Sequence, residues 1–352
     1  MTVPGEPFRT TEQSRLTTIC LVILAAVAIA AALAYTRAVM IPFVLAIFFT
    51  YLIAPLVDVL QDRLRLPRLV GIAVALLVAL GILSLIGFVI TTSTRGVLGS
   101  VDLYQARLLG AAQRVFDLLE HFGLDVGEQP VLDAIDRVPF LDFAQQAFGT
   151  AFDIVTVGGL VLIFVIYLLM GRRPPELRRG IYAEIDAKIR RYIVTKAAVS
   201  ATTGILVGLI LWMFGLDLAL VFGIMAFLLN FIPSVGSVIA TLLPIPIAVV
   251  QYESVWLILG VVLIPGAVQM TIGNVVEPVL MGEGLDLHPV TVLLALIFWG
   301  LLWGIVGMLL AAPITAVLRI VLARIETTRP VAELLAGRLP PPRAITGETP
   351  VG

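Results

Sequence analysis

Long stretches without a charged side chain dominate this sequence. A helix rises about 1.5 Å per residue, so about 20 apolar residues cross a hydrocarbon core of about 30 Å. Eight stretches free of Asp, Glu, Lys and Arg reach that scale: Leu16 to Thr36, Ala38 to Val57, Leu69 to Thr94, Ile154 to Gly171, Ala197 to Leu216, Leu218 to Tyr252, Ser254 to Val276, and Leu287 to Leu318. The pattern predicts an all-α polytopic membrane protein of about eight spans.

The first stretch resembles a secretory signal peptide in its position and in the small residues at its end. Its apolar run, from Ile19 to Ala34, is longer than the roughly 7–15 residues of a signal core, and further spans follow it. We therefore expect a permanent span.

Two stretches in the C-terminal half, Leu218 to Tyr252 and Leu287 to Leu318, are longer than one straight span requires. If both were hairpins, ten spans would result and the connection from Glu277 to His288 would be cytoplasmic. That connection carries acids but no Lys or Arg, which favours eight spans. Prolines and glycines are dense here, so a broken or re-entrant helix remains open for both stretches.

The charge pattern divides the chain into seven segments. Lys and Arg crowd the connection before Ala197, whereas acids outnumber bases after the third span, so the former is expected in the cytoplasm and the latter outside. The segments are a cytoplasmic N-terminus (1–16), three spans (17–94), an external amphipathic helical segment (95–152), a span (153–171), a basic cytoplasmic amphipathic helix (172–196), the transport core (197–318), and a partly disordered cytoplasmic tail (319–352).

Within the basic segment, apolar residues recur every four positions and make one stripe on a helix. They are Leu177, Ile181, Ile185, Ile189 and Ile193. The stripe is typical of an interfacial anchor, which we favour, or of a helix that transmits movement along the membrane.

Composition supports a membrane protein and excludes several other classes. Apolar residues make up 60% of the chain and charged residues 13%, and the 23 basic and 24 acidic residues nearly cancel, which gives no reason to expect nucleic acid. One cysteine, Cys20, permits no disulfide within the chain, and the sequence shows no zinc-protease, nucleophile-elbow or nucleotide-binding motif. We expect a multi-pass inner-membrane protein with cytoplasmic termini, no enzymatic activity, no catalytic residue, no metal and no cofactor.

A helix break is predicted in the middle of the stretch from Leu218 to Tyr252. There an amide, a proline and a glycine fall close together, so one helix can end and another begin with carbonyls facing a cavity. The residues are Asn230, Pro233, Ser234 and Gly236. A simple connecting loop is the alternative.

A second polar group follows, formed by Gln269, Asn274, Glu277 and Pro278. A carboxyl group near the membrane can exchange a proton or bind a cation, although Glu277 can also merely end a helix at the interface. In the last span, Gly300, Gly304 and Gly307 are expected to let helices pack closely.

At these residues the chain resembles the AI-2E transporters, a family named for export of the quorum-sensing signal autoinducer-2. The resemblance rests on Phe231 to Gly236, Gly273 to Pro278, Leu280 to Gly282, Leu287 to Leu294, and Trp303 to Ile314. It implies about eight spans and solute export, and some members of the family are described as sodium or proton antiporters. Such a resemblance does not fix the substrate.

The leading hypothesis is a secondary exporter of a small polar metabolite such as autoinducer-2, with the lipid bilayer and further copies of the chain as partners. A sodium or other cation/proton antiporter is the alternative, although no acid lies deep within a charge-free stretch. A membrane scaffold without transport activity is a third hypothesis. Amides buried in lipid speak against it, since a scaffold does not need them.

Overall fold

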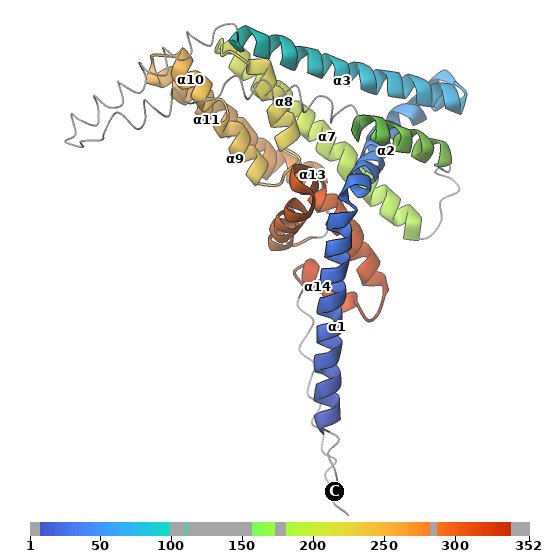
Figure 1. The fold of residues 1–352 in the computed structure, drawn as a ribbon. Coiled ribbons are helices and arrows are strands. Elements are labelled where there is room, and N and C mark those ends of the chain that lie inside the picture. The colour runs from blue at the N-terminus through green and yellow to red at the C-terminus, as the bar shows by residue number, and fades with distance from the viewer. Residues whose placement is uncertain (1–7, 99–109, 111–156, 173–180, 282–286, 339–352) are drawn as a thin grey trace, which may run out of the picture.

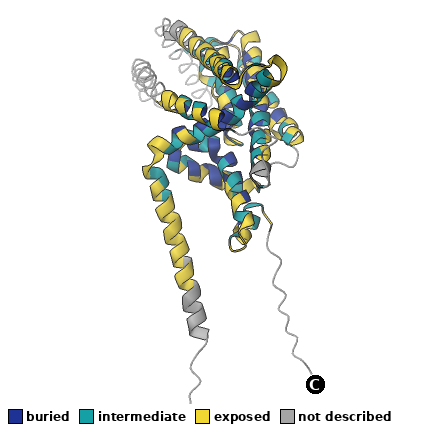
Figure 2. Cartoon of the chain, turned by 90° about the vertical axis from the view of Figure 1, so that its right-hand side faces the viewer, coloured by how far each residue is buried: buried dark blue, intermediate teal, exposed yellow. Residues whose placement is uncertain are grey.

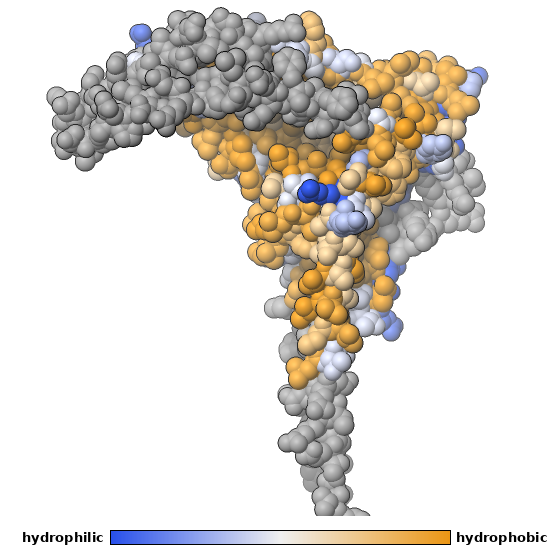
Figure 3. Space-filling view, viewed as in Figure 1, coloured by the Kyte–Doolittle hydropathy of each residue, from blue (hydrophilic) through white to orange (hydrophobic). Residues whose placement is uncertain are grey.

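The structure is a computed structural model that describes residues 8–98, 110, 157–172, 181–281 and 287–338. Within these residues the chain forms helices and no strand. Six helices there are long and apolar enough to cross a membrane, and shorter apolar helices accompany them. Apolar residues cover most of the described surface in Figure 3. The prediction of a polytopic helical membrane protein is confirmed. Most of the predicted external segment, 95–152, and the end of the tail lie outside the described residues.

The first two helices, α1 (Phe8–Tyr35) and α2 (Arg37–Leu64), are joined end to end. The helical hydrogen-bond pattern continues through Thr36, because its N–H donates to the Ala32 carbonyl and its own carbonyl accepts from Met40 N at 3.0 Å. The chain bends there without folding back on itself (Figure 1). Helix α1 is exposed along its apolar length (Figure 2), and α1 and α2 are each long and apolar enough to cross a membrane.

Helix α3 (Arg68–Leu98) returns along α2, and the helix Val157–Gly171 packs against this pair. Small alanines bring the three helices together: Ala46 and Ala54 of α2 and Ala75 of α3 are fully buried. At the charged end, Asp58 pairs with Arg190 at 3.0 Å and with Arg172 at 3.9 Å. The two basic connections therefore meet at one end of the molecule.

The basic segment and the following span form one helix, α7 (Ile181–Met213). Two members of the predicted apolar stripe, Ile189 and Ile193, are buried against Phe48, Phe231 and Leu310. The stripe therefore packs inside the protein at these two positions.

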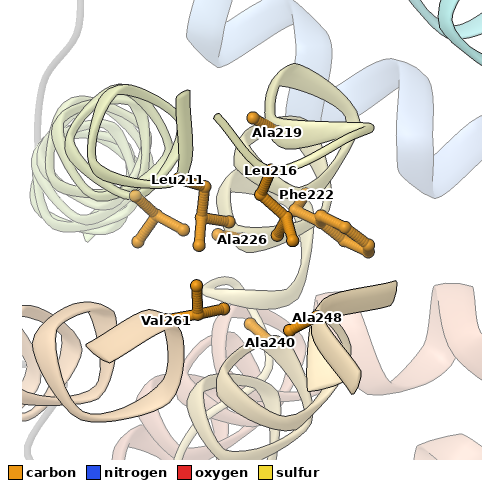
Figure 4. Packing of buried hydrophobic residues seen from close by; sticks show 9 residues of the cluster. Leu211, Leu216, Ala219, Phe222, Ala226, Ala240, Ala248 and Val261 are labelled. Atoms are coloured by element: carbon orange, nitrogen blue, oxygen red, sulfur yellow. The ribbon is translucent and has the colours of Figure 1, made fainter. Parts of the chain in front are cut away.

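The stretch from Leu218 to Tyr252 folds into a hairpin of short helices, α8 (Ala219–Leu229), α9 (Val235–Leu242) and α10 (Ile245–Gln251). Its two ends are tied together, because Gln251 accepts from Asp217 N at 2.8 Å and donates to the Gly215 carbonyl at 2.6 Å. A compact cluster fills the space between its arms and the neighbouring helices (Figure 4): Val207, Leu211, Leu216, Ala219, Phe222, Ala226, Ala240, Ala248 and Val261. We call this element the first hairpin.

The last long helix, α13 (Pro289–Arg324), is a second hairpin that turns at Gly304, where φ is 65° and ψ is −145°. Trp299 Nε1 donates to Thr315 Oγ1 at 3.2 Å, whereas a straight helix would separate these residues by about 24 Å. The base is closed by His288 N, which donates to the Leu335 carbonyl of α14 (Arg329–Leu335) at 3.0 Å.

The favoured interpretation that Leu287 to Leu318 crosses once is therefore corrected. Only glycine readily adopts the backbone angles of residue 304, and this reverses the chain within an otherwise continuous apolar run. Both long stretches reverse direction, as the alternative left open for them requires, and the ends of each hairpin lie on one side of the molecule.

Replacing Gly304 with Ala is expected to lower the thermal unfolding midpoint. A Cβ in this backbone region, which is nearly exclusive to glycine, costs about 1–3 kcal/mol. Gly81→Ala in α3 is the matched control, since a Cβ there meets no atom within 4 Å. Tryptophan fluorescence during heating in detergent gives both midpoints. Equal midpoints for the two variants would contradict the hairpin turn.

Between the hairpins, α11 (Val255–Thr271) continues through a π-helical turn, η2 (Ile272–Val276), into α12 (Glu277–Met281). A Cβ on Gly266 of α11 would lie 3.2 Å from the Thr241 methyl group of α9, so the first hairpin packs closely on α11. Four of the buried polar residues lie on α7 and α11, namely Lys196, Ser200, Thr203 and Gln269.

Candidate transport site at the hairpin tips

The tip of the first hairpin is the predicted helix break. After Leu229 the chain leaves helical geometry, Ser234 takes a φ of 61°, and Val235 begins the next helix. A Cβ on Gly236 would collide with the Leu229 carbonyl oxygen, so the close return of the chain requires glycine at that position. The predicted break is present in the structure, and its part in transport stays a prediction.

The tips of the two hairpins pack against each other. Ile232 of the first tip lies in one apolar cluster with Trp299, Trp303 and Ala311 of the second. Next to it, the Phe231 ring makes an edge contact with Phe48 at a centroid distance of 5.7 Å. Two chain reversals therefore meet inside the protein, where irregular backbone is tolerated because protein rather than lipid surrounds it.

The three glycines predicted for helix packing lie at the second tip. Gly304 makes the turn, a Cβ on Gly307 would collide with the Trp299 carbonyl, and a Cβ on Gly300 would lie 2.9 Å from the Met308 side chain. The close packing that they allow is between the two arms of one hairpin.

Asn230 contacts a stripe of buried polar residues on α7, formed by Lys196, Ser200 and Thr203. Its Nδ2 donates to Ser200 Oγ at 3.0 Å, and both side chains are buried. Lys196, Ser200 and Thr203 follow one another at spacings of four and three residues, which places them on one helix face. The same spacing is present in the sequence, where Lys196 is the last residue of the basic segment, 172–196.

Gln269 presents a buried amide between α11 and the first hairpin. Its Nε2 donates to Thr241 Oγ1 at 2.9 Å, and the residue is 3% exposed. Its Oε1 has no hydrogen-bond partner among the described residues. An unsatisfied buried acceptor costs about 1–3 kcal/mol, so a hydroxyl group from a solute or from water would stabilise this position.

Glu277 pairs with Lys196 at 2.5 Å and links α12 to α7. Lys196 is 3% exposed as a residue, and the Glu277 side chain retains 20%. The sequence placed this acid at the edge of a charge-free stretch, but the structure includes it in a helical run, Val255–Met281, long enough to span a membrane. The π-helical turn just before it adds a residue to one helix turn and so changes the direction in which the next side chains point.

The remaining predicted residues do not join these buried groups. Asn274 is exposed, and its Nδ2 donates to the Met270 carbonyl of its own helix at 3.0 Å. Pro278 and Ser234 are exposed as well. Asn230, through Ser200, and Glu277, through Lys196, thus contact one face of α7, and Gln269 makes a separate contact with Thr241.

No group of His, Cys, Asp or Glu side chains that could hold a metal ion occurs among the described residues. The buried groups of the site are amides, hydroxyls and one ion pair. Such groups bind a ligand by hydrogen bonds and charge.

Comparisons with known proteins agree with this architecture. Residues 19–327 match the model of a family described as AI-2E family transporter. The AI-2 transport protein TqsA of Escherichia coli (strain K12) is 29% identical over 317 residues, which cover 86% of this chain and 90% of that protein. A protein of Haemophilus influenzae, whose name says only that it is a transport protein, is 28% identical over 335 residues, covering 89% of this chain and 94% of its own length.

Proposed function

The chain belongs to the AI-2E family of transporters, and from that premise we propose that it is a secondary exporter of a small polar metabolite, with autoinducer-2 as the first candidate. The relative TqsA, which carries AI-2 transport in its name, motivates this choice of substrate. The proposed path passes Asn230, Pro233, Ser234, Gly236, Gln269, Asn274, Glu277 and Pro278.

The observation that carries this proposal is the meeting of two helix reversals beside buried, uncharged hydrogen-bonding groups. At the first tip, the residues around Pro233 have left the regular ladder of a helix, and the Leu229 and Ile232 carbonyls accept instead from backbone N–H groups within the turn. Asn230 supplies an amide group next to this tip, and Gln269, which contacts Thr241 at the far end of α9, has spare acceptor capacity at Oε1. A solute rich in hydroxyl groups satisfies such a surface without bringing charge into the membrane.

A cation/proton antiporter is the second candidate, favoured by the Lys196–Glu277 pair. An ion pair within membrane-spanning helices is expensive to bury, so it usually marks an ion or proton pathway. A proton or a sodium ion that neutralises Glu277 would release Lys196 and change the contact between α12 and α7. The pair thereby includes a partly buried acid within a candidate membrane span.

The same proposal includes location and assembly. We place the protein in the inner membrane with both termini in the cytoplasm, as the distribution of Lys and Arg predicts. We also propose a homo-oligomer, because the apolar length of α1 is exposed and is available to pack against another copy or against lipid.

Purified protein in liposomes distinguishes the two candidates. We expect release of preloaded autoinducer-2 above the rate of empty liposomes, and no proton movement driven by a sodium gradient. Gln269→Leu is the informative variant, since it removes the amide and leaves the ion pair intact, and it should reduce solute flux at least tenfold. Sodium-driven proton movement without solute flux would support the antiporter and overturn the exporter.

A further inference from the structure

A basic cavity lies between the end of α13 and α14, away from the hairpin tips. It has a volume of about 260 Å³ and is lined by Arg319, Ala323, Arg324, Arg329, Ala332, Glu333, Ala336 and Arg338. Four of the lining residues carry a guanidinium group and one carries a carboxylate. The three alanines leave room between the two helices, so the charged groups surround a space.

This cavity lies where a charge-free apolar run ends. The outgoing arm of the second hairpin is free of charge from Ile305 to Leu318, and Arg319 is the first charged residue after it. On α14, Val331 is 50% and Leu334 is 60% exposed. A short helix with exposed apolar residues beside arginines is suited to the boundary between acyl chains and headgroups.

We propose that this cavity binds the phosphate headgroup of an anionic phospholipid. Arginine forks match phosphate oxygens in pairs of hydrogen bonds, and basic pockets beside membrane helices are suited to acidic headgroups. Glu333, whose Oε1 accepts from Arg329 Nε at 3.2 Å, opposes an anion, but four guanidinium groups outweigh it. The acyl chains of the lipid extend along the exposed apolar side chains of α14.

Headgroup binding would reinforce the base of the second hairpin. Arg319 and Arg324 belong to the outgoing arm, whereas Arg338 follows α14. The incoming arm is tied to the same helix through the hydrogen bond from His288 N to Leu335 O. One bound anion therefore bridges the outgoing arm and the α14 segment, and it acts on the incoming arm only through that hydrogen bond.

Titration of the full-length protein in an uncharged detergent tests this inference. The probe is dioctanoyl phosphatidylglycerol, with dioctanoyl phosphatidylcholine and inorganic phosphate as separate arms, and the readout is the thermal unfolding midpoint. Phosphatidylglycerol should raise the midpoint, and the other two should leave it unchanged at equal concentration. Arg324→Gln/Arg338→Gln, which alters two exposed arginines, should weaken the effect at least tenfold in concentration.

A matched double variant and a steric variant keep the test decisive. Arg63→Gln/Arg191→Gln removes two exposed arginines outside the cavity and should leave the titration unchanged. Ala336→Leu keeps all charges but fills the cavity, and should weaken binding even if the double arginine variant folds poorly. Native mass spectrometry of the retained lipid gives an independent readout. Equal midpoint shifts for both double variants, or an equal shift from phosphate alone, would overturn the lipid site.

Discussion

Replacing Glu277 with Met is expected to destabilise the protein by about 3–5 kcal/mol, because it leaves the buried Lys196 ammonium group without its partner. Lys196, at 3% exposure, would keep its ammonium group in the interior without the carboxylate that lies 2.5 Å away. The double variant Lys196→Met/Glu277→Met should regain most of that stability, since apolar side chains of similar length often replace a buried pair without loss. Unfolding in a denaturing detergent, followed by tryptophan fluorescence, measures all three proteins.

The half-exposed pair of Arg190 and Asp58 is the internal control. Its side chains are 33% and 32% exposed, so Arg190→Met should cost no more than about 1 kcal/mol. Transport by the stable double variant then separates structure from function. Parental flux would show that the Lys196–Glu277 pair only stabilises the fold, whereas lost flux in a stable protein would assign it to the transport cycle. An undiminished stability of Glu277→Met would contradict the buried pair itself.

Substitutions at the first tip should separate folding from transport. Gly236→Leu is expected to prevent assembly of the hairpin, because its side chain would start inside the Leu229 carbonyl. Pro233→Ala should still insert, because it hardly changes the length or hydrophobicity of the run. It restores a backbone donor and removes a residue that opposes helix continuation by about 3 kcal/mol. We therefore expect Pro233→Ala to accumulate at the parental level and to transport at least tenfold more slowly.

Gly81→Ala in α3, outside the proposed path, is the control. A Cβ there meets no atom within 4 Å, so the variant should be as stable as the parent and should transport normally. Membrane accumulation by immunoblot and flux in liposomes are measured on the same samples. A parental transport rate for Pro233→Ala would mean that the break is a connecting loop with no role in the path.

The apolar pattern predicted the existence of the helices much better than their directions. Charge-free length is a local property, so every stretch that the structure describes turned out helical. Whether such a stretch crosses or returns depends on a few backbone angles and on contacts with distant segments. Gly304 was predicted only as one of three glycines that allow close helix packing. The positive φ with which it reverses α13 does not change the hydropathy of the stretch, so hydropathy could not predict the turn.

The candidate site was predicted in part for the same reason. Proline, glycine and asparagine at the first tip are unusual in an apolar run, and this made the break visible in the sequence. Lys196 was not predicted as a site residue because it is the last residue of the basic segment, 172–196, where one more charge is unremarkable. Its partner Glu277 lies 81 positions further along, and only the packing of α12 on α7 brings the two together.

The first hairpin also constrains the order in which the chain can mature during synthesis. Its α8 has 11 residues, about 16 Å of helix, which is half of what a bilayer core requires. Ribosomes produce Ile232 more than sixty residues before Trp299 and Trp303, which belong to the same apolar cluster. Until those residues have been synthesised, Ile232 lacks these indoles, so we expect this region to reach its final packing only after the C-terminal third of the polypeptide has been made.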